Sequence, residues 1–502
     1  MQFVKDLAKK TETALHQLQE KIEDATGYSF GNDHAMLESL GDLKIGDEHP
    51  IKHMVVICME NRSFDALLGW WAKEQQEKGV QIDGIPEAAK NIDSKTGTVW
   101  PAKPNATYVH EFDPDHETFA TTQQIYGMAS LDSNAPMFWH TNMGGFVDQA
   151  IDTDRKGLND NDPKKISDEL AAETVMSGFA PSQIPVFVSL AENFGVFDAW
   201  HAGIPGPTFP NRVFLASATS NGMSVNNNKE FAEGLPQKSI FQMFHEKKLS
   251  FKNYYGQAPT GLIFSDFRKI VEEDILHLNP SAHMGDMSAF KKDCEEGTLP
   301  TFSWIDPIFV QAPGFLANDM HPPHDAARGE ILIKEIYEAL RASPQWEKTA
   351  LLITFDEHGG YYDHVAPPTN VPSPDEISSN NKEFKFDRLG IRVPAILVSA
   401  HINKGAIFHD PAKPAPSDLG NYHASKYDHS SLVHSVNDMF NLDVDLNPRA
   451  RWSGSFAHKF TKYARKDCPV KLPDAPAITE RMEVYDEKSE WTSVFAAIKD
   501  LF

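Results

Sequence analysis

Two apolar runs end abruptly in polar side chains, and this pattern constrains the fold of the chain most strongly. Residues 54–58 read Met-Val-Val-Ile-Cys and lead into Met-Glu-Asn, and residues 350–355 read Ala-Leu-Leu-Ile-Thr-Phe and lead into Asp-Glu-His. Short apolar runs rich in β-forming residues are typical of buried parallel strands. Because open α/β sheets bind ligands at the carboxyl ends of their strands, the sequence predicts an α/β fold with a site there.

The polar residues after the two runs are candidate ligands of a cation. Glu60 and Asn61 offer oxygen atoms, while the adjacent carboxylates of Asp356 and Glu357 repel each other unless a cation or protons neutralise them. The alternatives are a polar loop with a helix cap at Glu60 and a solvated acidic turn at Asp356. A buried strand that leads straight into acidic side chains is costly without a metal or a substrate. Three carboxylates and an amide favour Ca²⁺, Mg²⁺ or Mn²⁺. Zn²⁺ stays an alternative, and it would be favoured more if His321 or His364 were also a ligand.

A third segment places a hydroxyl before a predicted helix. Residues 203–212 read Gly-Ile-Pro-Gly-Pro-Thr-Phe-Pro-Asn-Arg and lead into the apolar residues 213–218. Thr208 is placed to cap a helix that has Pro210 in its first turn. A hydroxyl at a helix N-terminus also lies where a phosphate binds, and Arg212 follows one turn later. Thr208 is therefore either a cap or a nucleophile.

Several motifs in order resemble the phosphoesterase family. This family contains bacterial phosphatidylcholine-type phospholipases C, plant non-specific phospholipases C and a branch of bacterial acid phosphatases. It implies an alkaline-phosphatase-like α/β core, with a mostly parallel sheet sandwiched by helices and a metal-assisted hydroxyl nucleophile. The resemblance rests on residues 60–65 (Glu-Asn-Arg-Ser-Phe-Asp), 210–212 (Pro-Asn-Arg), 321–325 (His-Pro-Pro-His-Asp), 356–360 (Asp-Glu-His-Gly-Gly), 392–399, 427–431 and 452–456.

The resemblance implies roles for individual residues. Glu60, Asn61, Asp356 and Glu357 match the metal ligands, and Thr208 matches the nucleophile. The acid phosphatase branch has a serine and an Asp-Asp pair at these places, whereas this chain has threonine and Asp-Glu, as the phospholipase branch does. The expected enzyme is a metal-dependent phospholipase C that forms a phosphothreonine intermediate. The alternatives are an acid phosphatase of the same family and a catalytically silent lipid-binding protein.

Two histidines and an arginine complete the expected site. His321 matches a family active-site position, and His116 is a second candidate in the segment Asp-Pro-Asp-His-Glu. Either histidine would stabilise the equatorial oxygens of the phosphate or protonate the leaving alcohol. Arg212 is the third expected catalytic residue beside Thr208. The resemblance implies a phospholipid substrate such as phosphatidylcholine and transient contact with a membrane surface.

The length of 502 residues predicts one large α/β domain with additions at both ends. We expect an amphipathic helix and linker over residues 1–50, a catalytic domain over 51–460 and a helical extension over 461–502. Three scattered cysteines indicate no disulfide framework. No pattern indicates an oligomeric state.

Charge and targeting patterns narrow the expected partners. The formal net charge of −24 argues against nucleic acid as a partner and against electrostatic docking on anionic membranes. The N-terminus lacks the apolar core of a secretory signal, and no run of about 18 apolar residues is present. We therefore expect a cytoplasmic protein, or one exported without a Sec-type signal peptide.

Overall fold

The computed structural model describes residues 48–127, 141–155, 166–226, 228–279, 281–312, 314–380, 384–411, 416–420, 422–479 and 491. The amphipathic helix expected near the N-terminus lies outside the described residues. Of the helix expected at the C-terminus, only Trp491 is described. The division into residues 1–50, 51–460 and 461–502 stays a prediction.

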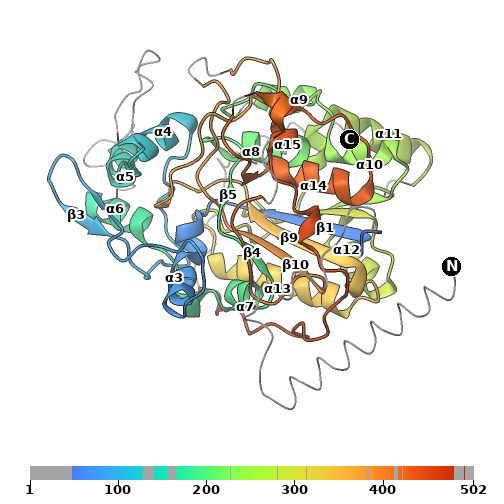
Figure 1. Ribbon diagram of the computed structural model, residues 1–502, viewed down its shortest axis with the longest axis horizontal. Helices are drawn as coiled ribbons and strands as arrows, with labels where there is room; N and C mark the ends of the chain where they lie inside the picture. The colour runs from blue at the N-terminus through green and yellow to red at the C-terminus, as the bar shows by residue number, and fades with distance from the viewer. Residues whose placement is uncertain are drawn as a thin grey trace.

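One eight-stranded sheet forms the centre of the protein, with the strand order β11-β4-β10-β9-β1-β8-β6-β7 (Figure 1). Within it β10 runs antiparallel to both neighbours, and every other pairing is parallel. The strands are β1 (His53–Met59), β4 (Gly195–Phe197), β6 (Phe251–Tyr255), β7 (Met284–Asp286), β8 (Phe302–Asp306), β9 (Thr349–Phe355), β10 (Ala395–Ser399) and β11 (Ala406–Phe408). Two small pairs lie outside this sheet, β2 (Lys90–Ile92) with β3 (Val99–Pro101) and β5 (Trp200–His201) with β12 (Tyr427–Asp428).

The register of the two central strands brings the predicted polar ends together. β1 and β9 are parallel neighbours, and Met59 pairs with Phe355 at their carboxyl ends. Glu60 and Asp356 are the next residues of each strand, so both leave the sheet at the same edge. The predicted pair of strands and their common edge are therefore confirmed.

Helices cover both faces of the sheet (Figure 1). One layer contains α7 (Pro185–Asn193), α12 (Met287–Glu296) and α13 (Ala326–Ala342). In this layer α13 contacts both α7 and α12. The opposite layer contains α8 (Thr208–Ser217) packed on α14 (Ser430–Phe440). The other helices of four or more residues are the π-helix η2 (Asp65–Gly69), α3 (Trp70–Glu77), α4 (Thr118–Tyr126), α5 (Phe146–Arg155), α6 (Asp168–Met176), α9 (Asn228–Glu233), α10 (Ile240–Glu246), η4 (Thr260–Ile263), α11 (Ser265–Leu276) and α15 (Pro448–Trp452).

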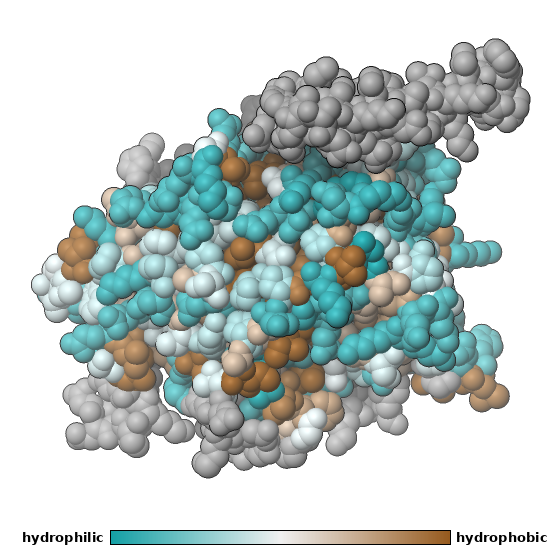
Figure 2. Space-filling view, turned by 90° about the horizontal axis from the view of Figure 1, so that it is seen from below, coloured by the Kyte–Doolittle hydropathy of each residue, from teal (hydrophilic) through white to brown (hydrophobic). Residues whose placement is uncertain are grey.

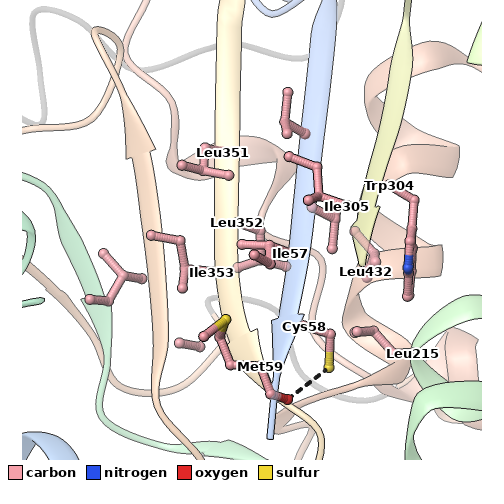
Figure 3. Packing of buried hydrophobic residues seen from close by; sticks show 14 of the residues in the cluster. Ile57, Cys58, Met59, Leu215, Trp304, Ile305, Leu351, Leu352, Ile353 and Leu432 are labelled. Carbon is pink, nitrogen blue, oxygen red and sulfur yellow. Dashed lines mark hydrogen bonds between the residues drawn. The ribbon is translucent and has the colours of Figure 1, made fainter. Parts of the chain in front are cut away.

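The core explains why the strand sequences are continuously apolar. All seven residues of β9 are buried, because helices cover the sheet on both faces. Leu215 of α8 and Leu432 of α14 lie against this core near the ends of the strands (Figure 3). In the same region the Cys58 thiol lies 3.6 Å from the carbonyl oxygen of Met59. All three cysteines are buried and free, as expected.

A smaller lobe with α4, α5 and α6 lies beside the main sheet (Figure 1). It has its own hydrophobic cluster, to which Phe146, Val147 and Val175 belong. On the face of the molecule shown in Figure 2, hydrophilic residues predominate and hydrophobic ones form small groups between them. Among the described residues no helix has the length and apolar character to cross a bilayer. The predicted α/β class, with a mostly parallel sheet between helices, is confirmed.

Glu330 of α13 supports the start of α7 from inside the core. Its two carboxylate oxygens accept hydrogen bonds from the backbone N–H groups of Val186 (2.7 Å) and Phe187 (2.9 Å). Burial raises the pKa of the Glu330 carboxyl to about 7, although the two N–H donors act in the opposite direction. Since the unfolded chain ionises near the ordinary value of 4.5, folding becomes less favourable as the pH rises from there to about 7.

We expect Glu330→Gln to remove this pH dependence. Near pH 5 the variant should be less stable than the wild type by about 1 kcal/mol, because the amide offers only one acceptor oxygen. Near pH 8 the difference in free energy of unfolding should shrink or reverse, because only the wild type then buries a charge. Urea denaturation at the two pH values measures this difference. A difference that grows with pH would contradict the assignment.

Candidate active site

Arg212 joins the ends of the two central strands. Its Nε donates to Asp356 Oδ2 at 3.1 Å, and its two terminal nitrogens donate to the carbonyl oxygens of Cys58 (3.1 Å) and Met59 (3.0 Å). The guanidinium is buried, and it lies over the ring of Phe309 at 4.6 Å. Arg212 was expected among the catalytic residues, and that role stays a prediction. The structure shows three of its donors bound to the strand ends, so it also positions Asp356.

Asp356 is held by groups from several elements. Its Oδ1 accepts hydrogen bonds from the backbone N–H groups of Asn61 (3.2 Å) and Glu357 (2.8 Å). His429 lies behind it, with Nε2 at 2.6 Å from the Asp356 carbonyl oxygen. Trp200 donates to Nδ1 of His429, so Nε2 carries the proton and donates to that carbonyl. Burial lowers the pKa of His429 to about 4, so it is neutral at ordinary pH.

Asn61 adopts a left-handed backbone conformation with φ of 58°, which asparagine tolerates better than most residues. Gly359 packs against it, and a β-carbon on that glycine would lie 2.7 Å from the Asn61 carbonyl oxygen. A glycine at position 359 therefore allows the two backbones to lie close together.

Several buried oxygen atoms at this edge have no hydrogen-bond partner within the described residues. They are Glu60 Oε2, Asn61 Oδ1, Glu357 Oε1 and Asp319 Oδ2. The Glu60 and Asp319 carboxyls can bond to each other only while Glu60 is protonated. Unpaired buried oxygens are costly, and so many at one place require compensation. Carboxylate and amide oxygens are the ligands that hard divalent cations prefer. The donor set predicted from the sequence therefore fits a divalent cation.

Burial keeps some of these carboxyl groups protonated when no cation is bound. It raises the pKa of Glu60 well above its usual range, and the charge of Asp319 raises it further. Burial also raises the pKa of Glu357 to about 8, although His116 acts in the opposite direction. A bound cation would reverse this effect by favouring the ionised forms.

Asp319 and His324 also lie at the candidate site, and no sequence motif assigned a role to either of them. The Asp319 carbonyl oxygen accepts from the Glu60 backbone N–H at 2.9 Å, and His324 Nδ1 lies 2.7 Å from Asp319 Oδ1. Burial alone would raise the pKa of Asp319, but the charge and hydrogen bond of His324 lower it below its usual value. The quoted motif at residues 321–325 contained His324. Asp319 precedes that motif and carried no signal of its own.

The two candidate histidines lie close together at the site. The ring centroids of His116 and His321 are 6.2 Å apart. His116 Nε2 lies 4.0 Å from Glu357 Oε1, and His321 Nε2 lies 3.8 Å from Asp113 Oδ2. His116 is buried, whereas the His321 side chain is 23% exposed. His321 is therefore the more accessible of the two, as a proton donor to a substrate must be.

Thr208 is the first residue of α8 and is buried. The residue at the N-cap is Pro207, which makes no side-chain cap hydrogen bond. The backbone N–H of Phe209 is satisfied instead by Asn226 Oδ1 at 3.2 Å. The capping role considered for Thr208 therefore receives no support. Arg212, one turn further along the same helix, contacts Asp356, so the N-terminal half of α8 lies at the acidic edge of the sheet.

Trp491 reaches the site from the far end of the chain. Its indole Nε1 donates to Glu60 Oε1 at 2.7 Å, and its ring stacks on Phe309 with a centroid distance of 3.7 Å. It also contacts the ring of Phe209, the residue after Thr208, at 4.6 Å. The side chain is buried. Trp491 fixes one oxygen of Glu60 and leaves Oε2 as the one available to a ligand.

A second acidic cluster lies further along the two segments that follow β1 and β9. Asp65, Asp363 and His364 have ligand atoms within 4.8 Å of one another, so they could hold a metal. Arg392 already supplies positive charge there, donating to Asp65 Oδ1 and to Asp363 Oδ1 at 3.0 Å each. His364 adds more, because its hydrogen bond to Asp65 helps raise its pKa to about 10 although burial opposes this. The cluster is therefore better explained as a buried salt bridge than as a metal site.

The sheet topology defines an α/β protein, and the buried carboxylates place its candidate functional site at the carboxyl edge of β1 and β9. Comparison with known proteins then shows that the chain belongs to the Phosphoesterase family, which matches residues 51–443. Non-specific phospholipase C6 of Arabidopsis thaliana is 40% identical over 435 residues, covering 85% of this chain and 76% of the relative. Non-specific phospholipase C1 of the same plant is 39% identical, covering 85% and 74%. The non-hemolytic phospholipase C of Burkholderia pseudomallei is 26% identical, covering 79% and 56%.

Solved structures show a weaker likeness. A Vibrio parahaemolyticus protein in the alkaline phosphatase superfamily is 10% identical, with a TM-score of 0.32 over 55% of this chain and 64% of that one. A TM-score of this size adds nothing to the fold class, which follows from the strand order and the helix layers.

Gly359 offers a direct test of the contact that shapes Asn61. Gly359→Ala should lower the free energy of unfolding by more than the roughly 1–2 kcal/mol of a left-handed alanine, because the new methyl group must displace the Asn61 backbone. Gly97→Ala is the matched control, since Gly97 also has positive φ but has no atom within 4 Å of the added carbon. Urea denaturation compares the two variants. Equal losses would contradict the close approach.

Proposed function

We propose that this protein is a phospholipase C, which hydrolyses the glycerol-side phosphodiester of a phospholipid to diacylglycerol and a phosphorylated headgroup. The observation that carries the proposal is the set of buried oxygens at the strand ends near α8 that have no donor within the described residues. Similarity to the plant phospholipases over most of both chains supports this choice of substrate class. Action on a phospholipid implies transient contact with a membrane surface.

We propose Glu60, Asn61, Asp356 and Glu357 as the residues that hold a divalent cation. Such a cation would supply the positive charge that lowers the pKa of a nearby hydroxyl and neutralises the phosphate. Arg212 keeps Asp356 in place, and Trp491 orients Glu60. The donor set favours Ca²⁺, Mg²⁺ or Mn²⁺, because every proposed ligand atom is oxygen.

The Thr208 oxygen is the proposed nucleophile. After losing its proton to water, it would attack phosphorus to form a phosphothreonine while the bond from phosphorus to the diacylglycerol oxygen breaks. His321 is the proposed donor of the proton that the leaving oxygen needs, because it is more exposed than His116. Water would then attack the phosphothreonine, release the phosphorylated headgroup and restore the Thr208 hydroxyl.

A substrate comparison separates this proposal from its main alternative, a phosphomonoesterase. Purified protein is incubated with vesicles of phosphatidylcholine and, separately, with p-nitrophenyl phosphate, in Ca²⁺, Mn²⁺, Mg²⁺ or Zn²⁺. We expect diacylglycerol to be released, and a chelator to abolish this release. The reason is that the cation is needed to neutralise the phosphate charge and to lower the pKa of the Thr208 hydroxyl. Fast turnover of the monoester without diacylglycerol release would identify a phosphomonoesterase instead. Vesicle binding without turnover in any metal would identify a silent lipid-binding protein.

Variants at Thr208 complete the same experiment. Thr208→Ala should lose activity by orders of magnitude while the protein still unfolds cooperatively, and Thr208→Ser should keep measurable activity because it retains the attacking oxygen. Thr349→Ala is the matched control, since Thr349 is a buried threonine at the opposite end of β9. The activity of Thr349→Ala per molecule of folded protein should equal that of the wild type. Substantial turnover by folded Thr208→Ala would exclude the phosphothreonine.

A further inference from the structure

Arg62 is a buried arginine that bonds to Asn61 and Tyr361 but has no carboxylate partner among the described residues. Its side chain is buried, yet no carboxylate lies within 4.0 Å of its guanidinium in the part of the chain that the structure describes. It donates to the carbonyl oxygen of Asn61 at 2.5 Å and lies over the Tyr361 ring at 4.6 Å, but its Nε has no hydrogen-bond partner there. By contrast, Arg212 and Arg392 each pair with at least one buried carboxylate.

A pocket of about 130 Å³, which we call the Arg62 pocket, opens beside this guanidinium. The buried side chains of Arg62, Phe179 and Tyr361 contribute to its lining, and the exposed residues Asn105 and Thr107 lie at its rim. The volume is sufficient for a small group such as a phosphate. It is also polar at the rim, where Asn105 Oδ1 accepts from Ser177 at 2.9 Å and leaves the Asn105 amide nitrogen as a donor.

No acidic group of the described residues lies within 4.0 Å of Arg62, although the charges of Asp113 and Glu357 reach the neighbouring Tyr361. His110, which also lines it, has Nδ1 at 2.7 Å from the Phe112 carbonyl, and its Nε2 lies 2.7 Å from the Tyr361 hydroxyl. Burial lowers the pKa of His110 to about 4, so it adds no charge. Glu173 is the acidic residue of the lining, but its side chain is 50% exposed and pairs with Lys103 at 3.8 Å.

A buried charge without a counter-ion costs several kcal/mol, which an anionic ligand would offset. Guanidinium groups bind phosphate oxygens through parallel hydrogen bonds, and neutral donors at the rim suit an anion with several oxygens. We infer that the Arg62 pocket is a second phosphate-binding site, distinct from the cation site at the strand ends. Its ligand is a phosphate group, carried either by a soluble phosphate or by a lipid headgroup. The inference does not depend on the proposed phospholipase activity.

Calorimetric titration with inorganic phosphate tests this inference. The full-length protein is titrated in a chelator at constant ionic strength, so that no cation at the strand ends attracts phosphate there. Arg62→Met should weaken phosphate binding about tenfold or more, because it removes charged hydrogen bonds. Lys103→Met is the matched control, since it removes a positive charge next to the lining residue Glu173 without touching Arg62. It should change the affinity far less.

Melting temperatures provide a second readout. Without phosphate, Arg62→Met should melt at or above the wild-type temperature, because an uncompensated buried charge is gone. Phosphate should raise the melting temperature of the wild type and leave that of Arg62→Met unchanged. If Arg62→Met does not fold, Asn105→Trp replaces it, because a large side chain at the exposed rim should block the pocket and also abolish the phosphate effect.

Vesicles separate the two sources of the phosphate. If soluble phosphate is the ligand, free phosphate binds to the wild type, and the Arg62 variant loses that binding. If a lipid headgroup is the ligand, free phosphate has no effect, and Arg62→Met weakens binding to phosphatidylcholine vesicles relative to Lys103→Met. Equal phosphate binding and equal vesicle binding by wild type and Arg62→Met would overturn the inference.

Discussion

The ion pair between Arg212 and Asp356 determines how the carboxyl edge of the sheet can be built. β1 and β9 each end in buried acidic residues, and Coulomb repulsion would drive these ends apart without positive charge between them. Arg212 supplies that charge from α8, and its remaining donors bind the carbonyl oxygens of Cys58 and Met59. One side chain therefore fixes the position of α8 relative to both strands. The first turn of that helix, with Thr208, is consequently held at the acidic edge.

Two buried arginines divide the acidic residues of the β1 and β9 loops into two groups. Arg392 neutralises Asp65 and Asp363, so that group is complete without a further cation. Arg212 neutralises Asp356 only in part, and oxygens of Glu60 and Glu357 remain without partners in the described structure. The difference explains why the closer cluster of ligand atoms is a salt bridge, whereas the more widely spaced cluster is the proposed cation site.

Local patterns in the sequence sufficed to predict the central strands and the polar residues that follow them. A strand that is buried on both faces is apolar along its length, and the local sequence of residues 350–355 alone shows this pattern. Thr208 at the start of a helix was likewise predictable from its neighbours. The contacts of Asp319 and Trp491 with Glu60 were not, because they join residues hundreds of positions apart or lie in loops without periodicity. The pairing of Arg212 with backbone carbonyls was also beyond the sequence, since it depends on how α8 packs.

The central claim is that a divalent cation binds at the carboxyl edge of β1 and β9. Anomalous diffraction from crystals grown with Mn²⁺ tests this claim most directly, because it locates the ion without reference to activity. The account predicts an anomalous peak among the oxygens of Glu60, Asn61, Asp356 and Glu357. A peak beside Asp65 and its neighbours, or crystals of folded protein with no peak at the strand ends at saturating Mn²⁺, would contradict it.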